Sequence, residues 1–242
     1  NPNAPNASLL VFENPATVLT SSQGMEALGA APMSVSVSVI VPTKNEAANL
    51  PHVLPRIPKW VEEVILVDAD STDGTVEVAR RLLPDIKVVK QQGKGKGAAL
   101  KSGFAAASGQ IIITLDADGS ADPGEIPSFV GALLAGADFV KGSRFLQGGE
   151  TTDMEWYRSL GNWGLLQLVK IRFGGRFTDL CYGYNAFWRN VLPLMDLDSA
   201  TGFEIETCMN IQALRSEIEV WEVASKEYPR IHGVSNLRTI PD

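Results

Sequence analysis

The sequence predicts an α/β fold in which a mostly parallel central sheet is flanked by helices. Three observations support this prediction. Strand-like and helix-like segments alternate from residue 35 to residue 118. The strand-like segments are apolar on both faces, as expected for parallel strands buried between two layers of helices. Three of these strands also end in polar residues, at the edge where open α/β sheets bind ligands.

The elements follow in chain order. Four segments with runs of Val and Ile are the predicted strands: 35–42, 61–68, 86–91 and 111–118. Three segments between them are the predicted helices: 45–57, 73–83 and 96–108. The first helix is interrupted by prolines, the second carries apolar residues at helical spacing, and the third is rich in alanine.

A further helix is predicted after the fourth strand, at 122–136. Asp122 is its expected N-cap, Pro123 takes the first helical position and Glu125 the third. This is ordinary helix capping, so we predict a structural role for these acids rather than a catalytic one. In the later segment 203–217, Phe203, Met209 and Leu214 are expected in the core.

Composition limits the class of protein. The chain has 242 residues, of which 45% are hydrophobic, enough for one large domain or two closely packed ones. Its net charge of −7 argues against a nucleic-acid partner. Cys181 and Cys208 lack metal-ligand spacing and are expected to be buried thiols in a reducing compartment. No run of 18 apolar residues and no basic segment before an apolar core occurs, so the expected location is the cytoplasm.

The first 34 residues differ from the rest. They are rich in Asn, Pro, Ala and Ser and contain no basic residue. We therefore predict a flexible N-terminal arm at 1–34 and a folded domain at 35–242.

Polar residues follow three predicted strands, at 42–46, 68–71 and 116–118. Carboxyl ends of parallel strands meet at one edge of a sheet, so the carboxylates among them would repel one another unless a cation joined them. Mg²⁺ or Mn²⁺ accepts such oxygen ligands and bridges them to phosphates. An alternative interpretation is that Asp118 only caps a turn.

The segment GKGKGAALKSGFAAASG at 93–109 places three glycines before an alanine-rich helix. Glycine permits close backbone approach to a ligand, and lysines beside a helix N-terminus supply positive potential. The segment is neither a Walker loop nor a dinucleotide fingerprint, since position 98 is alanine. With the metal candidate it predicts a bound diphosphate. The alternative is a glycine-rich connection with solvated lysines.

Several motifs occur together in a characteristic order: PTKNEAANL, VDADSTDGT, GKGKGAALKSGF, LDADGSADP, KGSRF, RSLGN, DLCYGYNAF, FEIE and RIHGVSNL. This ordered set resembles family 2 glycosyltransferases with the GT-A fold, specifically the dolichol- or polyprenyl-phosphate mannosyl- and glucosyltransferase branch. The resemblance covers residues 35–238. It implies a donor half at about 35–145 and an acceptor half at about 146–238.

The resemblance also implies roles for individual residues. Donor-binding positions are Pro42, Thr43, Asn45, Glu46, Asp68, Asp70, Lys96 and Asp116. The metal ligands are Asp116 and Asp118, with Mg²⁺ or Mn²⁺ as the cofactor. Acceptor-binding positions are Arg144, Arg158, Glu204, Arg230 and Ser235. Catalytic positions are Asp118, Arg144, Asp179 and Arg230.

The implied activity is metal-dependent, inverting transfer of a hexose from a GDP- or UDP-linked donor to a polyprenyl phosphate. A phosphate acceptor is already anionic at neutral pH and needs cations rather than a base. An alcohol acceptor would need a general base, for which Asp179 and Glu204 are the candidates.

Three positions depart from the family pattern. Ala69 stands where a second aspartate is common, Ser120 where a glutamine often assists the metal, and Asn236 where the closing motif often has lysine. Two alternatives therefore stay open. One is a soluble glycosyltransferase acting on a hydroxyl group, and the other is a catalytically silent module that binds sugar nucleotides.

The segment 154–176 is apolar and aromatic, with basic residues interspersed. Two interpretations are open. A helix here could lie in a membrane interface, which would make the protein peripheral at the inner face of the membrane. It could also pack on the sheet with its basic residues solvated.

Overall fold

The computed structural model describes residues 35–151, several helical positions between 163 and 172, and residues 177–233. The predicted arm, Arg158 and Ser235 lie outside the described residues. Among the residues described, no helix is long and apolar enough to cross a membrane.

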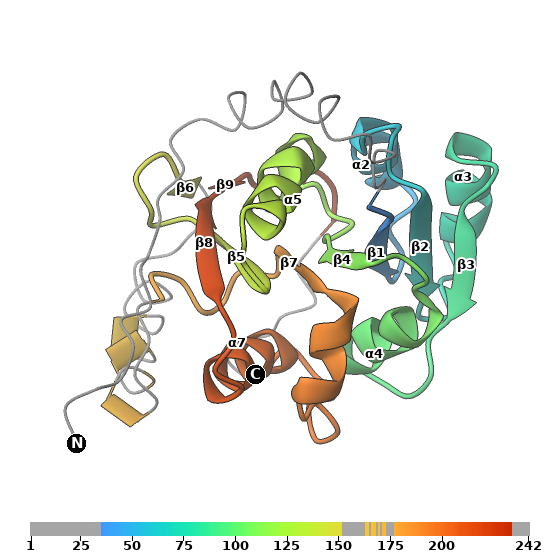
Figure 1. The fold of residues 1–242 in the computed structure, drawn as a ribbon. Helices are drawn as coiled ribbons and strands as arrows, with labels where there is room; N and C mark the ends of the chain where they lie inside the picture. Colours follow the sequence, from blue (N-terminus) through green and yellow to red (C-terminus); the bar gives the residue numbers. More distant parts are fainter. Residues whose placement is uncertain are drawn as a thin grey trace, which may run out of the picture.

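A seven-stranded sheet forms the centre of the protein, with strand order β3-β2-β1-β4-β7-β5-β8 (Figure 1). Its strands are β1 (Val37–Thr43), β2 (Glu63–Asp68), β3 (Lys87–Lys90), β4 (Ile111–Thr114), β5 (Phe139–Ser143), β7 (Asn185–Trp188) and β8 (Val220–Ala224). β7 is antiparallel to both of its neighbours, and the other pairs are parallel. The predicted mostly parallel sheet is confirmed.

Helices cover both faces of the sheet. One face packs against α2 (Leu50–Val53), α3 (Thr75–Leu82) and α5 (Ile126–Leu134). The other packs against α4 (Lys96–Ala106), the 3₁₀ segment η5 (Arg189–Leu194) and α7 (Ile205–Arg215). Along β1, Val39 and Val41 face the first layer whereas Ile40 faces the second. This alternation is why the strand is apolar on both faces.

Short elements complete the fold. The 3₁₀ segments η3 (Leu54–Arg56) and η4 (Pro123–Glu125) extend the first layer, and β6 (Glu150–Thr151) pairs with β9 (Lys226–Glu227) in a separate two-stranded sheet. This small sheet lies beside β8, at the opposite end of the main sheet from β3 (Figure 1).

Several predicted boundaries were wrong. The helix expected at 45–57 is reduced to α2 and η3, because Pro51 and Pro55 each lie in the first turn of a separate short helical segment. β4 ends at Thr114 rather than at residue 118, so the following carboxylates leave the sheet. Asp122 does cap η4 by accepting from the Gly124 amide, but Glu125 instead accepts hydrogen bonds from Ser225 and the Lys226 amide.

Two predictions about burial were also wrong. Cys181 is exposed. Its backbone amide donates to the carboxylate of the buried Asp179, so this contact fixes the backbone of the loop and not the thiol. Phe203 is 41% exposed rather than in the core, because it precedes α7 and faces a cleft.

Candidate active site

A cleft of about 820 Å³ opens at the carboxyl edge of the sheet. Residues from the ends of β1 and β2, from the glycine-rich loop and from the segment after β4 form its wall. The predicted site residues in this wall are Pro42, Thr43, Glu46, Asp70, Lys96, Asp116, Asp118 and Arg230. The parallel topology therefore assembles most of the predicted donor site from segments far apart in sequence.

Lys96, the first residue of α4, lies between two carboxylates. Its Nζ is 2.7 Å from Asp116 Oδ1, and it also forms an ion pair with Glu206 of α7. Burial raises the pKa of Asp116 to about 6, against the lowering effect of Lys96. Burial would lower the pKa of Lys96, but Asp116 and Glu206 outweigh it and raise that pKa above its ordinary value. The lysine thus stays cationic beside the candidate metal ligand.

The glycine-rich loop is held against the segment before α7. Gly95 has φ +89°, a conformation that side chains rarely adopt, and a β-carbon there would collide with the carbonyl oxygen of Thr201. The amide of Ala98 donates to the same carbonyl oxygen at 3.2 Å. The loop is therefore fixed where it borders the cleft.

Arg230 joins the C-terminal part of the described chain to two acids of the cleft. Its Nη2 lies 2.5 and 2.6 Å from the oxygens of Glu46, and its Nη1 lies 3.3 Å from Asp118 Oδ2. Asn49 stabilises this arrangement by donating to Glu46 at 2.6 Å and by exchanging hydrogen bonds with the backbone of His232. Residues 46–49 and 230–232 are thus held together on one side of the cleft.

Asp118 has two roles in this geometry. Its Oδ1 accepts hydrogen bonds from the amide and the hydroxyl of Ser120, at 3.0 and 2.7 Å, so the residue does cap a turn. Its Oδ2 faces Arg230 in the cleft. Ser120, which stands where the family often has glutamine, therefore orients the Asp118 carboxylate by binding the oxygen that does not contact Arg230.

The side chains present fit a divalent ion. Four acids, Glu46, Asp116, Asp118 and Glu206, share two bases, Lys96 and Arg230, which leaves two negative charges in excess. Carboxylate oxygens are the ligands that Mg²⁺ and Mn²⁺ prefer. In the part of the chain that the structure describes, no group of three or more acids, histidines or cysteines could hold a metal. Asp116 and Asp118 would therefore need the donor phosphates or water to complete the coordination.

Three predicted donor residues build the loops around the cleft. Asn45, at φ 57°, accepts from the Thr72 amide and donates its own amide to Ser71, which ties the loop after β1 to the loop after β2. Asp68 accepts from the Ser71 amide, and its other oxygen is buried without a hydrogen bond. Neither residue lines the cleft. Asp70 does line it and pairs with Lys90 at 2.7 Å.

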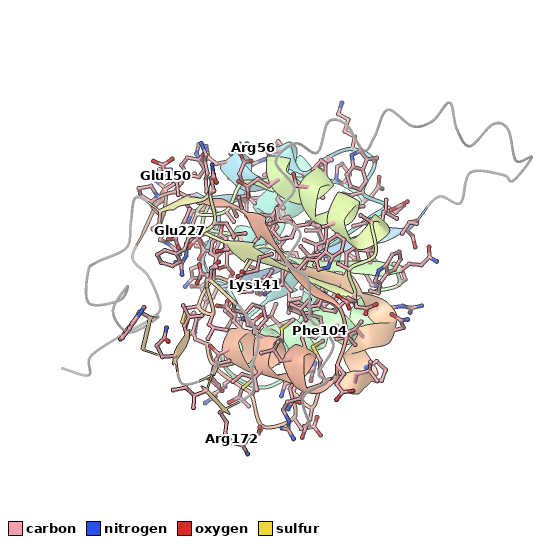
Figure 2. All side chains as sticks on the ribbon, turned by 60° about the vertical axis from the view of Figure 1, so that its left-hand side comes forward. Arg56, Phe104, Lys141, Glu150, Arg172 and Glu227 are labelled. Atoms are coloured by element: carbon pink, nitrogen blue, oxygen red, sulfur yellow. The ribbon has the colours of Figure 1, made fainter. Side chains whose placement is uncertain are left out.

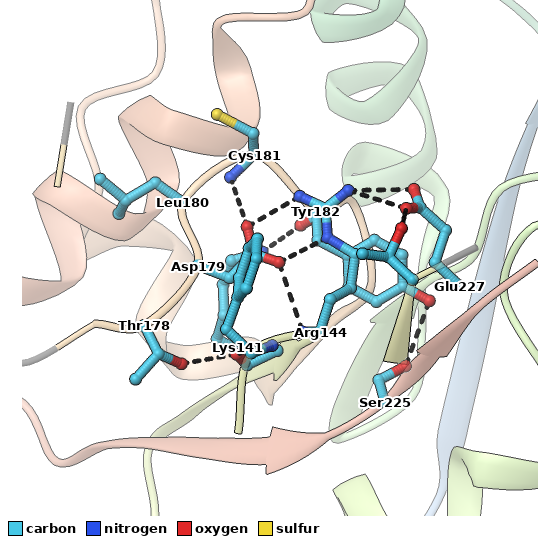
Figure 3. A network of polar contacts seen from close by, with 12 residues as sticks. Lys141, Arg144, Thr178, Asp179, Leu180, Cys181, Tyr182, Ser225 and Glu227 are labelled. Carbon is cyan, nitrogen blue, oxygen red and sulfur yellow. Dashed lines mark hydrogen bonds and ion pairs between the residues drawn. The ribbon is translucent and has the colours of Figure 1, made fainter. Parts of the chain in front are cut away.

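Arg144 lies outside this wall, in a second polar cluster (Figure 3). Its Nε donates to Asp179 Oδ2 at 2.6 Å and its Nη2 donates to Asp179 Oδ1 at 2.9 Å. Its Nη1 lies 3.0 Å from both oxygens of Glu227. The predicted catalytic residues therefore fall into two groups, Asp118 with Arg230 and Arg144 with Asp179.

The geometry does not support either predicted general base. Asp179 is fully buried, both of its oxygens are engaged by Arg144, and these contacts outweigh burial and lower its pKa. Glu204 accepts the amides of Thr201 and Gly202 at the start of α7. Both carboxylates organise local structure.

Sequence reasoning did not select several residues of these clusters. Lys44, Gln91, Lys94 and Phe203 line the cleft, Glu206 holds Lys96, and Glu227 holds Arg144. The FEIE motif was part of the family resemblance, but only Glu204 was given a role from it. Glu206 lies two residues further along, inside α7, where it points at Lys96. No sequence signal marks Glu227.

Comparison with known proteins gives a family match. The sequence matches the family described as "Glycosyl transferase family 2" over residues 38–193. It is 35% identical over 216 residues to a "Dolichol-phosphate mannosyltransferase" from Pyrococcus furiosus, covering 84% of this chain but only 60% of that relative's length. It is 32% identical over 211 residues to a "Polyprenol monophosphomannose synthase" from Mycolicibacterium smegmatis, covering 82% of this chain and 80% of the relative.

The fold resembles that of a solved enzyme. Glucosyl-3-phosphoglycerate synthase from Mycobacterium tuberculosis, in complex with Mg²⁺ and uridine diphosphate, superposes with a TM-score of 0.68. The match covers 93% of this chain and 79% of that one at 22% identity. It confirms the GT-A type of fold.

Proposed function

The chain belongs to glycosyl transferase family 2, and we propose that it transfers a hexose from a GDP- or UDP-linked donor to a polyprenyl phosphate, with inversion at the anomeric carbon. It is thus a glycosyltransferase, as its family and named relatives are. The proposal concerns the acceptor, the donor, the metal and the stereochemistry. The names of both relatives specify transfer to, or synthesis on, a polyprenol-type phosphate.

The observation that carries the proposal is the pairing of acids in the cleft. Each carboxylate that lines it has a basic partner: Glu46 and Asp118 with Arg230, Asp116 with Lys96, and Asp70 with Lys90. An alcohol acceptor would need a carboxylate ready to take its proton. A phosphate monoester is already largely anionic at neutral pH. The paired acids therefore favour a phosphate acceptor.

The donor fits the cleft by charge. Asp116 and Asp118 would hold Mg²⁺ or Mn²⁺, which when bound offsets negative charge on the departing nucleoside diphosphate. Lys96 and the fixed glycine-rich loop add positive potential at the same wall, and Lys44 and Lys94 also line it. Such preorganised cations stabilise a transition state in which negative charge grows.

The acceptor phosphate is positioned by arginine. Arg230 lies beside Asp118, and Nη1 of Arg144 points away from Asp179 toward Glu227, which a phosphate oxygen would replace. Arginine donates strong, charge-assisted hydrogen bonds to phosphate oxygens. Held in this way, a phosphate oxygen attacks the anomeric carbon from the face opposite the leaving group, so the configuration inverts.

A transfer assay tests the proposal. GDP- and UDP-hexoses would be offered with Mn²⁺ or Mg²⁺, using a short polyprenyl phosphate and the matching free alcohol as acceptors. We expect transfer to the phosphate. Preference for the alcohol would support the hydroxyl-acceptor alternative, and binding of sugar nucleotides without turnover would support the silent module. Deleting residues 1–33 should leave the rate per folded molecule nearly unchanged if the arm is separate from the catalytic domain.

We also propose peripheral contact with a membrane, which would bring the protein to a lipid acceptor. In the described helical positions between 163 and 172, Trp163 is 60% exposed and Ile171 is 83% exposed, whereas Val169 is buried. Exposed Trp and aliphatic side chains on a helix favour the membrane interface. Replacing Trp163 and Ile171 with serine should reduce sedimentation with anionic vesicles. Unchanged sedimentation would contradict this role.

A further inference from the structure

We propose that Glu227 is the displaceable counterion of Arg144 and that it sets the affinity of the enzyme for its acceptor phosphate. The proposal rests on the proposed function, because it takes the acceptor phosphate to bind at Arg144. It adds a specificity-determining residue, since Glu227 would compete with the incoming phosphate for the same guanidinium edge.

The inner edge of Arg144 is not available to a ligand. Nε and Nη2 are both committed to Asp179, whose side chain is fully buried. The Asp179 carboxylate also accepts from the Cys181 amide at 3.1 Å, which fixes it within its loop. Removing this carboxylate from the arginine would leave a buried charge unpaired, at high energetic cost.

The outer edge has an exchangeable partner. Nη1 lies 3.0 Å from each oxygen of Glu227, and Glu227 Oε2 also accepts from the Thr151 hydroxyl at 2.6 Å. The Glu227 side chain is 18% exposed, compared with 0% for Asp179. Water can therefore solvate Glu227 if it leaves, so it is the partner that a ligand would displace.

Charge explains why displacement is required. Glu227 and an incoming phosphate are both anions, so they repel one another when both face the Nη1 edge of Arg144. Once Glu227 has moved away, Nη1 can donate to a phosphate oxygen instead. The acceptor would thus bind by exchange of one anion for another.

The position of Glu227 places this exchange beside the donor site. Glu227 forms a β-bridge with Ala121, and the next amide, of Tyr228, donates to the Ser120 carbonyl at 2.8 Å. Ser120 belongs to the turn that Asp118 caps, and Ala121 directly follows it. A phosphate at Arg144 would therefore lie next to the segment that carries a candidate metal ligand.

Glu227→Gln tests the inference, because it keeps the shape of the side chain and removes its charge. The matched control is Glu150→Gln, which removes a charge from the partner strand of the same small sheet, where Glu150 lies 3.8 Å from Lys226. Figure 2 shows Glu150 and Glu227 on the same side of the molecule, with Lys141 further inside. The KM for a short polyprenyl phosphate, the KM for the donor and inhibition by inorganic phosphate would be measured for each protein.

We expect Glu227→Gln to lower the acceptor KM by about tenfold, because a partly buried charge that competes with the phosphate is lost. The donor KM should not change. Inorganic phosphate should inhibit it at correspondingly lower concentration, and Glu150→Gln should resemble wild type. An acceptor KM that is unchanged or raised would overturn the inference.

A second variant keeps the test valid if Glu227→Gln folds poorly. Thr151→Val removes the hydroxyl that holds Glu227 in place, so it should lower the acceptor KM in the same direction by a smaller factor. An unchanged KM in both folded variants rejects the role of Glu227. Wild-type enzyme that uses the alcohol instead of the phosphate would reject the proposed function itself, which separates the two failures.

Discussion

Replacing Asp179 with asparagine should destabilise the protein much more than it impairs the chemical step. The Asp179 carboxylate is fully buried and accepts hydrogen bonds from Nε and Nη2 of Arg144 and from the Cys181 amide. Asparagine can accept at only one of its two side-chain positions, so one N–H of Arg144 would face another N–H group. The guanidinium would also lose its buried counterion.

The magnitude follows from this burial. Breaking a buried ion pair by removing one partner costs about 3–5 kcal/mol in free energy of unfolding. For a domain of this size each kcal/mol lowers Tm by about 2–4 °C, so the expected loss is roughly 6–20 °C. Calorimetry or thermal circular dichroism at neutral pH would measure it.

The pH dependence gives a second readout. Contacts with Arg144 hold the pKa of Asp179 below its ordinary value. The stabilisation is therefore present above the pKa of the unfolded chain and is lost as pH falls through the folded pKa. Asp179→Asn should remove this acid-side loss, so the difference in Tm between variant and wild type should shrink below about pH 4.

Activity separates a structural role from a catalytic one. At a temperature where the variant is folded, kcat per folded molecule should fall by less than about tenfold, since the carboxylate lies outside the cleft wall. A variant with wild-type Tm and a loss of several orders of magnitude in kcat would refute this reasoning and restore Asp179 as a base.

Three further predictions concern the clusters described above. Asp118→Asn should weaken the Mn²⁺-dependent binding of a nucleoside diphosphate by at least about tenfold and leave Tm unchanged, because one charge that would hold the metal is lost. Calorimetry would measure the binding. Unchanged binding would exclude Asp118 as a metal ligand. Arg230→Lys keeps the positive charge but loses the guanidinium group that binds both Glu46 and Asp118. The KM for the acceptor should therefore rise more than the KM for the donor. An equal rise in both would contradict a role of Arg230 in positioning the acceptor. Burial raises the pKa of the Glu222 carboxyl to about 7 in the folded protein. The protonated carboxyl therefore stabilises the folded state fully at pH values below the pKa of Glu222 in the unfolded chain. This stabilisation is lost as the pH rises through about 7. Glu222→Gln should therefore remove a decline of about 3 kcal/mol in unfolding free energy between pH 4.5 and 7.5, measured by urea titration, and an unchanged slope would argue against a protonated Glu222.

The central sheet and the location of the cleft could be predicted because both follow from the alternation of strands and helices. Parallel strands joined by helices must bring their carboxyl ends to one edge, so Glu46 and Asp116 line the same cleft although they lie in different loops. Arg230 also joins this wall, 184 positions after Glu46, and only its motif indicated that.

Of the second cluster, Arg144 and Asp179 were indicated by the family resemblance, whereas Glu227 was missed for a physical reason. Glu227 contacts Arg144 across 83 positions through a two-residue strand, and such a strand has no periodicity to detect. The early end of β4 was missed because its apolar pattern continues past Thr114, and tertiary contacts decide where pairing stops. The family resemblance indicated Arg144 but could not show which anion it holds.

The antiparallel strand β7 has a consequence for how the chain folds as it is synthesised. β4 and β5 are successive strands along the chain, but they do not pair with each other, because β7 lies between them in the sheet. The first four strands can form a sheet while the chain is still emerging, whereas β5 must wait for residues 185–188 before it gains a partner on that side. A ribosome stalled before Asn185 should therefore hold a nascent chain in which β1 to β4 resist protease and residues 139–143 are cut.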